Sequence, residues 1–276
     1  MRPTSFLSRL PALSRPVLHA AAAAAAAFVA AAGAAHATSF QVTFEAPGAR
    51  SADRSTLCAA LGGDACTFGV ETFDARPIGA GQNVTTDYGT GGAITGAYKN
   101  VQVATAGTYG GAGGNHAVTY ASGGYQLSLT TTLSGGVNYF GYWLSALDRG
   151  NRVTFYDGDA EVYRFTAADL MARVGACPNA SNAYCGNPDP AFRDRTKHEA
   201  YVFVNFLDTQ GTFDRIVFTQ ALTGAGYESD NHTIGHVSAR SDAPTTSVPE
   251  PASFALMGVG LAGLGIIRRR GWSKAA

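Results

Sequence analysis

The stretch that decides the fold is residues 151–165, Asn-Arg-Val-Thr-Phe-Tyr-Asp-Gly-Asp-Ala-Glu-Val-Tyr-Arg-Phe. Val153 and Phe155 lie two positions apart, so they share one face of an extended chain. The pair Asp157-Gly158 suits a tight turn, and a second run of β-branched and aromatic residues follows it from Glu161. The stretch therefore predicts an antiparallel β-hairpin with one buried face.

Similar short runs, separated by glycine, asparagine and aspartate, recur on both sides of this hairpin. They predict many short strands and a single all-β domain, 38–240, with the architecture of a β-sandwich or jelly roll. The run 200–207 is apolar on nearly both sides, as in a strand that is covered on both faces. The predicted strands are 39–44, 69–73, 101–104, 116–120, 125–130, 137–144, 152–156, 161–166, 200–207, 212–220 and 233–239.

One short helix is predicted between the strands, from Thr166 to Val174. Thr166 is a suitable N-cap, and Asp169 stands three positions later, where it can complete a capping box. Gly175 is expected to end the helix.

The composition excludes several classes of protein. Charged residues make up 14% of the 276 residues, against about 25% in an average soluble chain, and 34 residues are glycine. A coiled coil, a collagen and a charged disordered chain are excluded. The formal net charge is +0 for the full sequence, but residues 38–247 contain 13 basic and 19 acidic residues, a net charge of −6. We therefore expect no nucleic-acid partner.

Residues 1–37 have the features of a secretory signal peptide. Arg2, Arg9 and Arg15 precede an alanine-rich apolar run, which ends on the small-x-small pattern 35–37. Signal peptidase is the expected partner, and its cleavage would leave Thr38 at the N-terminus. The alternative is an uncleaved membrane helix, but polyalanine is only weakly hydrophobic.

The C-terminal end contains a second targeting segment. A polar linker, 241–248, leads into Pro249, Glu250 and Pro251, and sixteen uncharged residues, 252–267, follow them. As a helix these span about 24 Å, and Arg268, Arg269 and Arg270 would hold the following tail, 272–276, in the cytoplasm. Contact with the membrane is therefore expected only through this helix. An ordinary single-span anchor is the alternative.

The segment 249–271 resembles the PEP-CTERM sorting signal of Gram-negative bacteria. The resemblance is in the order of its three parts: the Pro-Glu-Pro motif, the glycine-rich apolar helix and the arginine cluster. It implies cleavage near Pro-Glu-Pro by the membrane protease exosortase. It further implies export across the inner membrane, a transient anchor, and release to the cell surface or the extracellular matrix.

The stretch 138–158 resembles a pattern that recurs in exosortase-dependent surface proteins, FG-x-W-x-S-x-D followed by N-x-(V/I)-x-FYDG. Residues 212–218 and 226–231 resemble the closing strands of the same proteins. This group has no established enzymatic role, so the resemblance supports a fold class more than a function.

Four cysteines remain after the predicted processing, and they allow three disulfide connectivities. Cys58 and Cys66 form one local pair, and Cys177 and Cys185 form a second pair with the same spacing. In an oxidising compartment we predict these two local disulfides. A four-thiolate zinc site is the alternative, but the close cysteine spacing that it requires is absent.

We expect no resident cofactor, with one candidate exception. Carbohydrate-binding jelly rolls often carry a structural calcium ion that joins the first strand to the last. Glu45, Asp230 and Asn231 are the residues that would supply oxygen ligands to such an ion. A sandwich edge that closes without an ion is the alternative.

No catalytic motif is present, so we predict a non-enzymatic surface or matrix protein linked to exopolysaccharide or biofilm. The alternative is a carbohydrate-binding module that uses exposed aromatic rings. Tyr139, Tyr142 and Trp143 are its candidate ligand-binding residues, and core packing is the competing explanation for these rings. A secreted hydrolase is the third hypothesis, and it requires an exposed pair of acids in a groove.

Overall fold

The structure is a computed structural model, which describes residues 39–120 and 123–239. The predicted signal peptide, linker, sorting segment and tail lie outside these residues, and their boundaries stay predictions. The strands are β1 (Phe40–Phe44), β2 (Gly63–Glu71), β3 (Gly79–Thr86), β4 (Ile94–Ala104), β5 (His116–Tyr120), β6 (Gly124–Thr131), β7 (Tyr139–Ser145), β8 (Asn151–Asp157), β9 (Ala160–Thr166), β10 (Val202–Asp208), β11 (Arg215–Gln220) and β12 (Gly226–Ala239). The helices are α2 (Arg54–Ala60), α3 (Ala167–Val174) and α4 (Arg193–Thr196).

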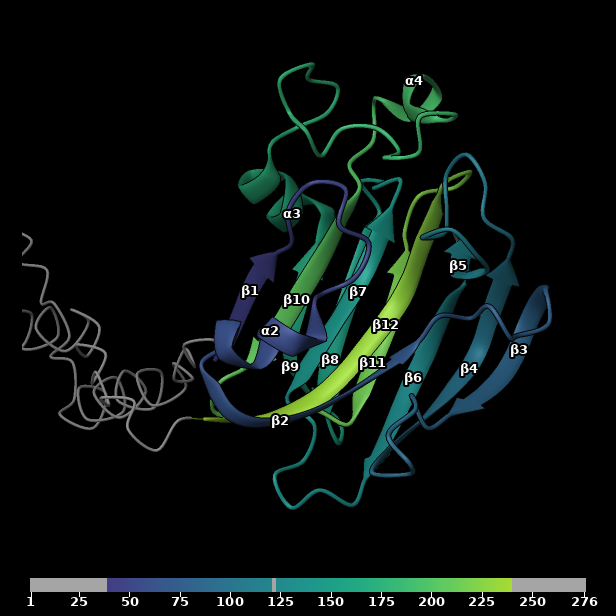
Figure 1. The fold of residues 1–276 in the computed structure, drawn as a ribbon. Coiled ribbons are helices and arrows are strands. Elements are labelled where there is room, and N and C mark those ends of the chain that lie inside the picture. The colour runs from purple at the N-terminus through teal and green to yellow at the C-terminus, as the bar shows by residue number, and fades with distance from the viewer. Residues whose placement is uncertain (1–38, 121–122, 240–276) are drawn as a thin grey trace, which may run out of the picture.

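All the strands belong to one antiparallel sheet that is nearly closed. The order along it is β1-β10-β7-β12-β5-β4-β6-β11-β8-β9, with β2 added to β12 and β3 added to β4. The all-β prediction is therefore confirmed. Figure 1 shows β10, β7 and β12 side by side in one layer, with β9, β8 and β11 behind them.

Aromatic side chains fill the space between the two layers. Phe40 of β1 stacks on Tyr163 of β9, with ring centroids 4.5 Å apart. Phe155 of β8 lies 5.0 Å from Phe206 of β10. These rings, with the other buried apolar residues between the layers, form the main core. Burial of such rings is the largest favourable contribution to the folding of a domain of this kind.

The local predictions around residues 151–175 are confirmed. β8 pairs with β9 as an antiparallel hairpin, and Gly158 in the turn has φ 57°, a conformation that favours glycine. Thr166 and Asp169 form the predicted capping box, and Gly175 ends α3. Every residue of β10 is buried, as its two-sided apolar pattern predicts.

The outer face of β10, β7 and β12 is buried by a second, smaller cluster. Leu57 of α2 packs there with the rings of Tyr139, Trp143 and Phe203. Cys58 and Cys66 form a disulfide that ties α2 to β2, and Cys177 and Cys185 form the other. Both predicted local disulfides are confirmed. In Figure 1, α2 and β2 cross in front of this face.

The last strand, β12, lies within the sheet and pairs with three other strands. Asn231 of β12 has φ 49°, and the register with β7 shifts between Asp230 and Thr233. Before this bulge the other edge of β12 pairs with β5, and after it with β2. The bulge thus lets one strand join three neighbours.

Both ends of the described chain lie at the same end of the domain. Asn138 exchanges two hydrogen bonds with Val237 near the end of β12, and its carbonyl accepts a third from Asp208. Asp208 is in turn the register partner of Phe40 at the start of β1. Among residues 39–120 and 123–239, no helix is long and apolar enough to cross a membrane.

Candidate functional site

The aromatic residues predicted to bind a ligand lie inside the protein. Tyr139, Tyr142 and Trp143 are each at most 1% exposed. Tyr142 donates to or accepts from Tyr227 in the main core, and Tyr139 donates to Asn205 at 2.6 Å. The prediction that these three rings form a binding surface is wrong, because β7 is covered on both faces. Core packing, the competing explanation, is what the structure shows.

The three residues predicted to hold calcium are not brought together. Glu45 follows β1 and accepts a hydrogen bond from Asn205, whereas Asp230 lies in β12, with β10 and β7 between them. Three strand spacings amount to about 14 Å. Asp230 accepts the amide of Ala112, and the side chain of Asn231 donates to the carbonyl of Arg50. The predicted first-to-last-strand site is therefore wrong, because β1 is not the neighbour of β12.

A histidine lies at the centre of the main core. His232 is fully buried, with Nδ1 2.9 Å from the hydroxyl of Tyr98 and Nε2 3.0 Å from the hydroxyl of Ser229. Ser229 is also 2.6 Å from the hydroxyl of Tyr125. Burial lowers the pKa of His232 to about 3, so the ring is neutral at physiological pH. This serine–histidine pair has its hydrogen bonds satisfied and no access to solvent, so it is part of the packing.

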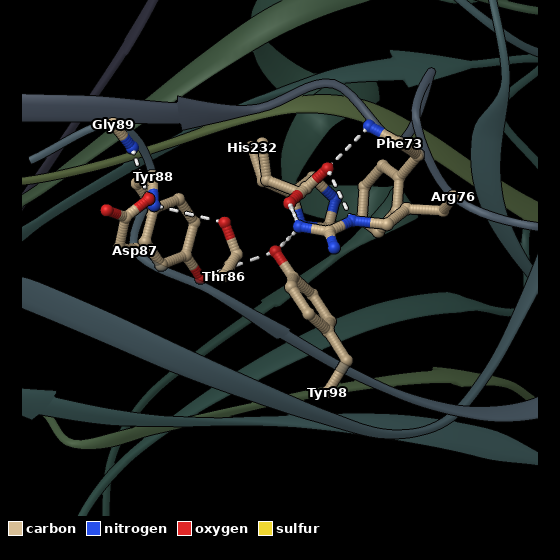
Figure 2. Close-up of polar contacts among 9 residues, drawn as sticks. Phe73, Arg76, Thr86, Asp87, Tyr88, Gly89, Tyr98 and His232 are labelled. Atoms are coloured by element: carbon tan, nitrogen blue, oxygen red, sulfur yellow. Dashed lines mark hydrogen bonds and ion pairs between the residues drawn. The ribbon is translucent and has the colours of Figure 1, made fainter.

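An ion pair between Arg76 and Glu71 lies in the same region, where Figure 2 shows Arg76, Tyr98 and His232. Arg76 binds both carboxylate oxygens of Glu71, and the backbone amide of Phe73 donates to the same carboxylate. The hydroxyls of Tyr98 and Tyr88 meet behind it at 3.4 Å. The arrangement satisfies buried polar groups, and it leaves no carboxylate oxygen of Glu71 free for chemistry.

A third polar region surrounds Gly226 at the start of β12. The amide of Gly226 donates to Asp148, which follows β7, and its carbonyl accepts from Asn151 and Gln220. The carboxylate of Glu228 folds back over Gly226, since a Cβ added there would lie 2.1 Å from Glu228 Oε1. We call Asp148, Glu199, Glu228 and Gly226, together with Ser145, the Gly226 cluster.

The carboxylates of this cluster repel one another. Burial, together with the charges of Asp148 and Glu199, raises the pKa of Glu228 to about 8. The pKa of Glu199 is raised to about 7 by burial and by Asp148. Burial also raises the pKa of Asp148 itself. Each of the three carboxylates is therefore within electrostatic reach of another, and their charged forms are all disfavoured.

Several polar atoms in and beside the cluster have no hydrogen-bond partner. They include Glu228 Oε2, Glu199 Oε2 and Ser145 Oγ, all buried. Ser145 lies directly opposite Glu228 in the β12–β7 ladder, so both side chains are on the outer face of the sheet. Buried oxygens without partners are uncommon in native proteins and call for a ligand, a water molecule or a proton.

Exposed rings flank the cluster. Tyr109 is 53% exposed and Tyr120 is 48% exposed. Tyr120 is the register partner of Gly226, and burial and the charge of Glu228 raise its pKa. Tyr109 lies near Tyr201, whose hydroxyl donates to the neighbouring carbonyl of Thr108. Tyr109 and Tyr120 are thus exposed rings, whereas Tyr139, Tyr142 and Trp143 are buried.

A cavity of about 660 Å³ lies at the other end of β12, where both ends of the described chain meet. Its walls include Asn138, Asp208, His236 and Val237. Asp208 is occupied by hydrogen bonds from Ser39, Gln210 and Gly211. The cavity therefore offers a polar surface, and Oδ1 of its buried acid already accepts these three hydrogen bonds.

Comparison with known proteins identifies the C-terminal segment. Residues 247–270 match the family of the PEP-CTERM protein-sorting motif. No curated protein matches the chain. The match confirms the resemblance of the tail, and it implies export, a transient C-terminal membrane anchor and processing by exosortase.

Proposed function

We propose that this PEP-CTERM protein is a non-enzymatic component of the cell surface or extracellular matrix of a Gram-negative bacterium. In this proposal a signal peptidase removes residues 1–37, and exosortase cuts near Pro249, Glu250 and Pro251. The released protein then takes part in the exopolysaccharide matrix or biofilm. The observation that carries the proposal is the sorting motif at residues 247–270.

Two properties of the folded domain support export. Both disulfides close short local loops, and such bonds persist in an oxidising compartment. The net charge of −6 over residues 38–247 keeps a released protein soluble.

The chemistry of the buried side chains supports a structural role. Ser229 and His232, which could form a nucleophile–base pair, are held by Tyr125 and Tyr98 inside the main core. Glu228 and Asp230 share the outer face of β12, but they are 8% and 2% exposed. This pair of acids gives no support to the hydrolase hypothesis, since glycoside cleavage needs both acids at an open groove.

A carbohydrate-binding role is the second candidate function. Tyr109 and Tyr120 expose their rings beside the carboxylates of the Gly226 cluster. Sugars stack on aromatic faces and donate hydroxyl hydrogen bonds to carboxylates. A pull-down with the exopolysaccharide of the native host tests it: Tyr109→Ala with Tyr120→Ala should abolish retention, and retention equal to that of the wild type would refute it.

Mass spectrometry of the native protein tests the main proposal. We expect the released protein to begin at Thr38 and to end near Pro249–Pro251. Replacing Pro249, Glu250 and Pro251 by alanine should leave an intact C-terminus in the membrane fraction. Replacing Pro244 by alanine in the linker is the matched control. Intact termini in both the cell-bound and the released protein would overturn the proposal.

A further inference from the structure

We propose that the Gly226 cluster binds a divalent cation with the oxygen-ligand preference of Ca²⁺, held by Glu228, Glu199 and the hydroxyl of Ser145. The inference goes beyond sorting and is independent of it, because it concerns only the folded domain. It also moves the candidate calcium site from the first-to-last-strand position to the junction of β12, β7 and the segment before β10.

The first argument is charge. The charged neighbours that shift the pKa of Glu228 are Asp148 and Glu199, and both are acidic. Ion pairs elsewhere in the described residues give Glu71 and Glu161 an arginine partner each. Glu228 is 8% exposed and lacks such a partner, and an uncompensated buried carboxylate is costly. A bound cation would remove this cost.

The second argument is the set of free oxygens. Ser145 is completely buried, and its Oγ lacks a hydrogen-bond partner in the described structure. It faces Glu228 across the β12–β7 ladder, and Oε2 of Glu228 lacks a partner as well. A hydroxyl and a carboxylate that leave these atoms free on the same face can both ligate a hard cation.

The third argument is the arrangement of the backbone and its hydrogen bonds around Gly226. Gly226 leaves the space into which the Glu228 carboxylate folds, since a Cβ at this position would lie 2.1 Å from Oε1. Asn151 and Gln220 fix the Gly226 carbonyl at 2.8 Å each. Asp148 is held by the Gly226 amide at 3.1 Å. The backbone thus positions the acids through contacts that do not use the free oxygens.

The ligand set is small, which predicts weak binding. In residues 39–120 and 123–239, no three Asp, Glu, His or Cys side chains converge on one point. Two carboxylates and one hydroxyl therefore provide the protein ligands, and water completes the six to eight oxygens that Ca²⁺ takes. Extracellular calcium modules with few charged ligands bind in the range of about 0.1–1 mM.

The surroundings of Glu228 suit a cation. The groups that face Glu228 are Asp148, Glu199, Tyr120 and Tyr201. These four side chains are neutral or negatively charged, so none of them competes with a bound cation.

Thermal melting of the exported protein, first with EDTA and then with about 10 mM CaCl₂, tests the proposal. At a Kd of about 1 mM the melting temperature should rise by about 3–6 °C. Glu228→Gln and Gly226→Ala should each abolish the rise. The matched control is Glu161→Gln, which makes the same charge change at an exposed site and should leave the rise intact.

The outcomes separate the proposal from its alternatives. No rise for the wild-type protein would overturn it, and the free oxygens would then hold protons or water only. A rise that persists in Glu228→Gln would also overturn it, since the ion would bind elsewhere. Folding of each variant is verified by its melting transition in EDTA, where Glu228→Gln should be at least as stable as the wild type at pH 8.

Discussion

Glu228 and Ser145 lie directly opposite each other on adjacent strands, and each presents a buried oxygen without a hydrogen-bond partner. In most proteins such a pair would hydrogen-bond, because an unmade buried bond costs about 1–3 kcal/mol. Here the Glu228 carboxylate turns toward Gly226 instead. In the part of the chain that the structure describes, buried oxygens without hydrogen-bond partners therefore gather at the start of β12.

The first prediction concerns pH. The pKa of Glu228 is raised to about 8 in the folded protein, so the native state binds the proton more tightly than the unfolded chain. This contribution is complete at low pH and is lost as the pH rises through 8. With EDTA present, raising the pH from 6.5 to 8 should lower the free energy of unfolding by up to about 2 kcal/mol.

Denaturant unfolding at several pH values measures this effect, and Glu228→Gln should flatten the dependence. The raised pKa values of Glu199 and Asp230, both about 7, act in the same direction and leave a smaller slope in the variant. Below pH 6.5 the buried His232 and His116, with pKa values lowered to about 3 and about 4, act in the opposite direction. A wild-type stability that rises between pH 6.5 and 8 would contradict the prediction.

The second prediction concerns Gly69 in β2. A Cβ at this position would lie 2.4 Å from the carbonyl oxygen of Tyr88 and 2.6 Å from the Tyr88 Cβ. Gly69→Ala should therefore destabilise the domain by about 3 kcal/mol, the upper range for overpacking. Gly107→Ala is the control, because a Cβ there meets no atom within 4 Å. Equal unfolding midpoints for the two variants would refute the argument.

The third prediction concerns the capping box of α3. Thr166→Ala removes the side-chain oxygen that accepts the amide of Asp169, and should cost about 1 kcal/mol. Thr166→Ser keeps this oxygen and should restore most of the loss. Urea unfolding of both variants measures the difference. A serine variant as unstable as the alanine variant would show that the methyl group, and not the cap, matters.

The fourth prediction concerns the disulfide between Cys58 and Cys66, which closes a loop with a sequence separation of 8. Chain-entropy arguments give about 2.5 kcal/mol for a loop of this size. Replacing both cysteines by alanine should lower the free energy of unfolding by that amount, with the rest of the sheet intact by circular dichroism. A loss below about 0.5 kcal/mol would indicate that the packing of Leu57 holds α2 without the bond.

The sequence predicted the elements that carry a strong local signal. The alternation around Val153 and Phe155, the Asp157-Gly158 turn and the Thr166–Asp169 cap each encode their structure within a few residues. β3, by contrast, was not predicted, because it pairs with β4 alone and is mostly exposed, so its side chains carry no apolar pattern. α2 buries only Leu57, which leaves no periodic face to detect.

The candidate site was predicted poorly for a related reason. Whether Trp143 is exposed depends on what covers the outer face of β7, and the covering residues, such as Leu57, are distant in sequence. Likewise, the neighbours of Glu228 come from the loop after β7 and the segment before β10. Strand order decides both contacts, and no local pattern reports strand order.

The hydrogen bonds of Asn138 determine where the two ends of the described chain lie relative to the Gly226 cluster. They bring the end of β12 beside the strand that begins the domain, so the two ends of the described chain lie at one pole. The Gly226 cluster lies at the start of the same strand, about 40 Å of extended chain away. The acids of the Gly226 cluster, with Tyr109 and Tyr120, therefore lie far from the end of the described chain that leads into the sorting motif.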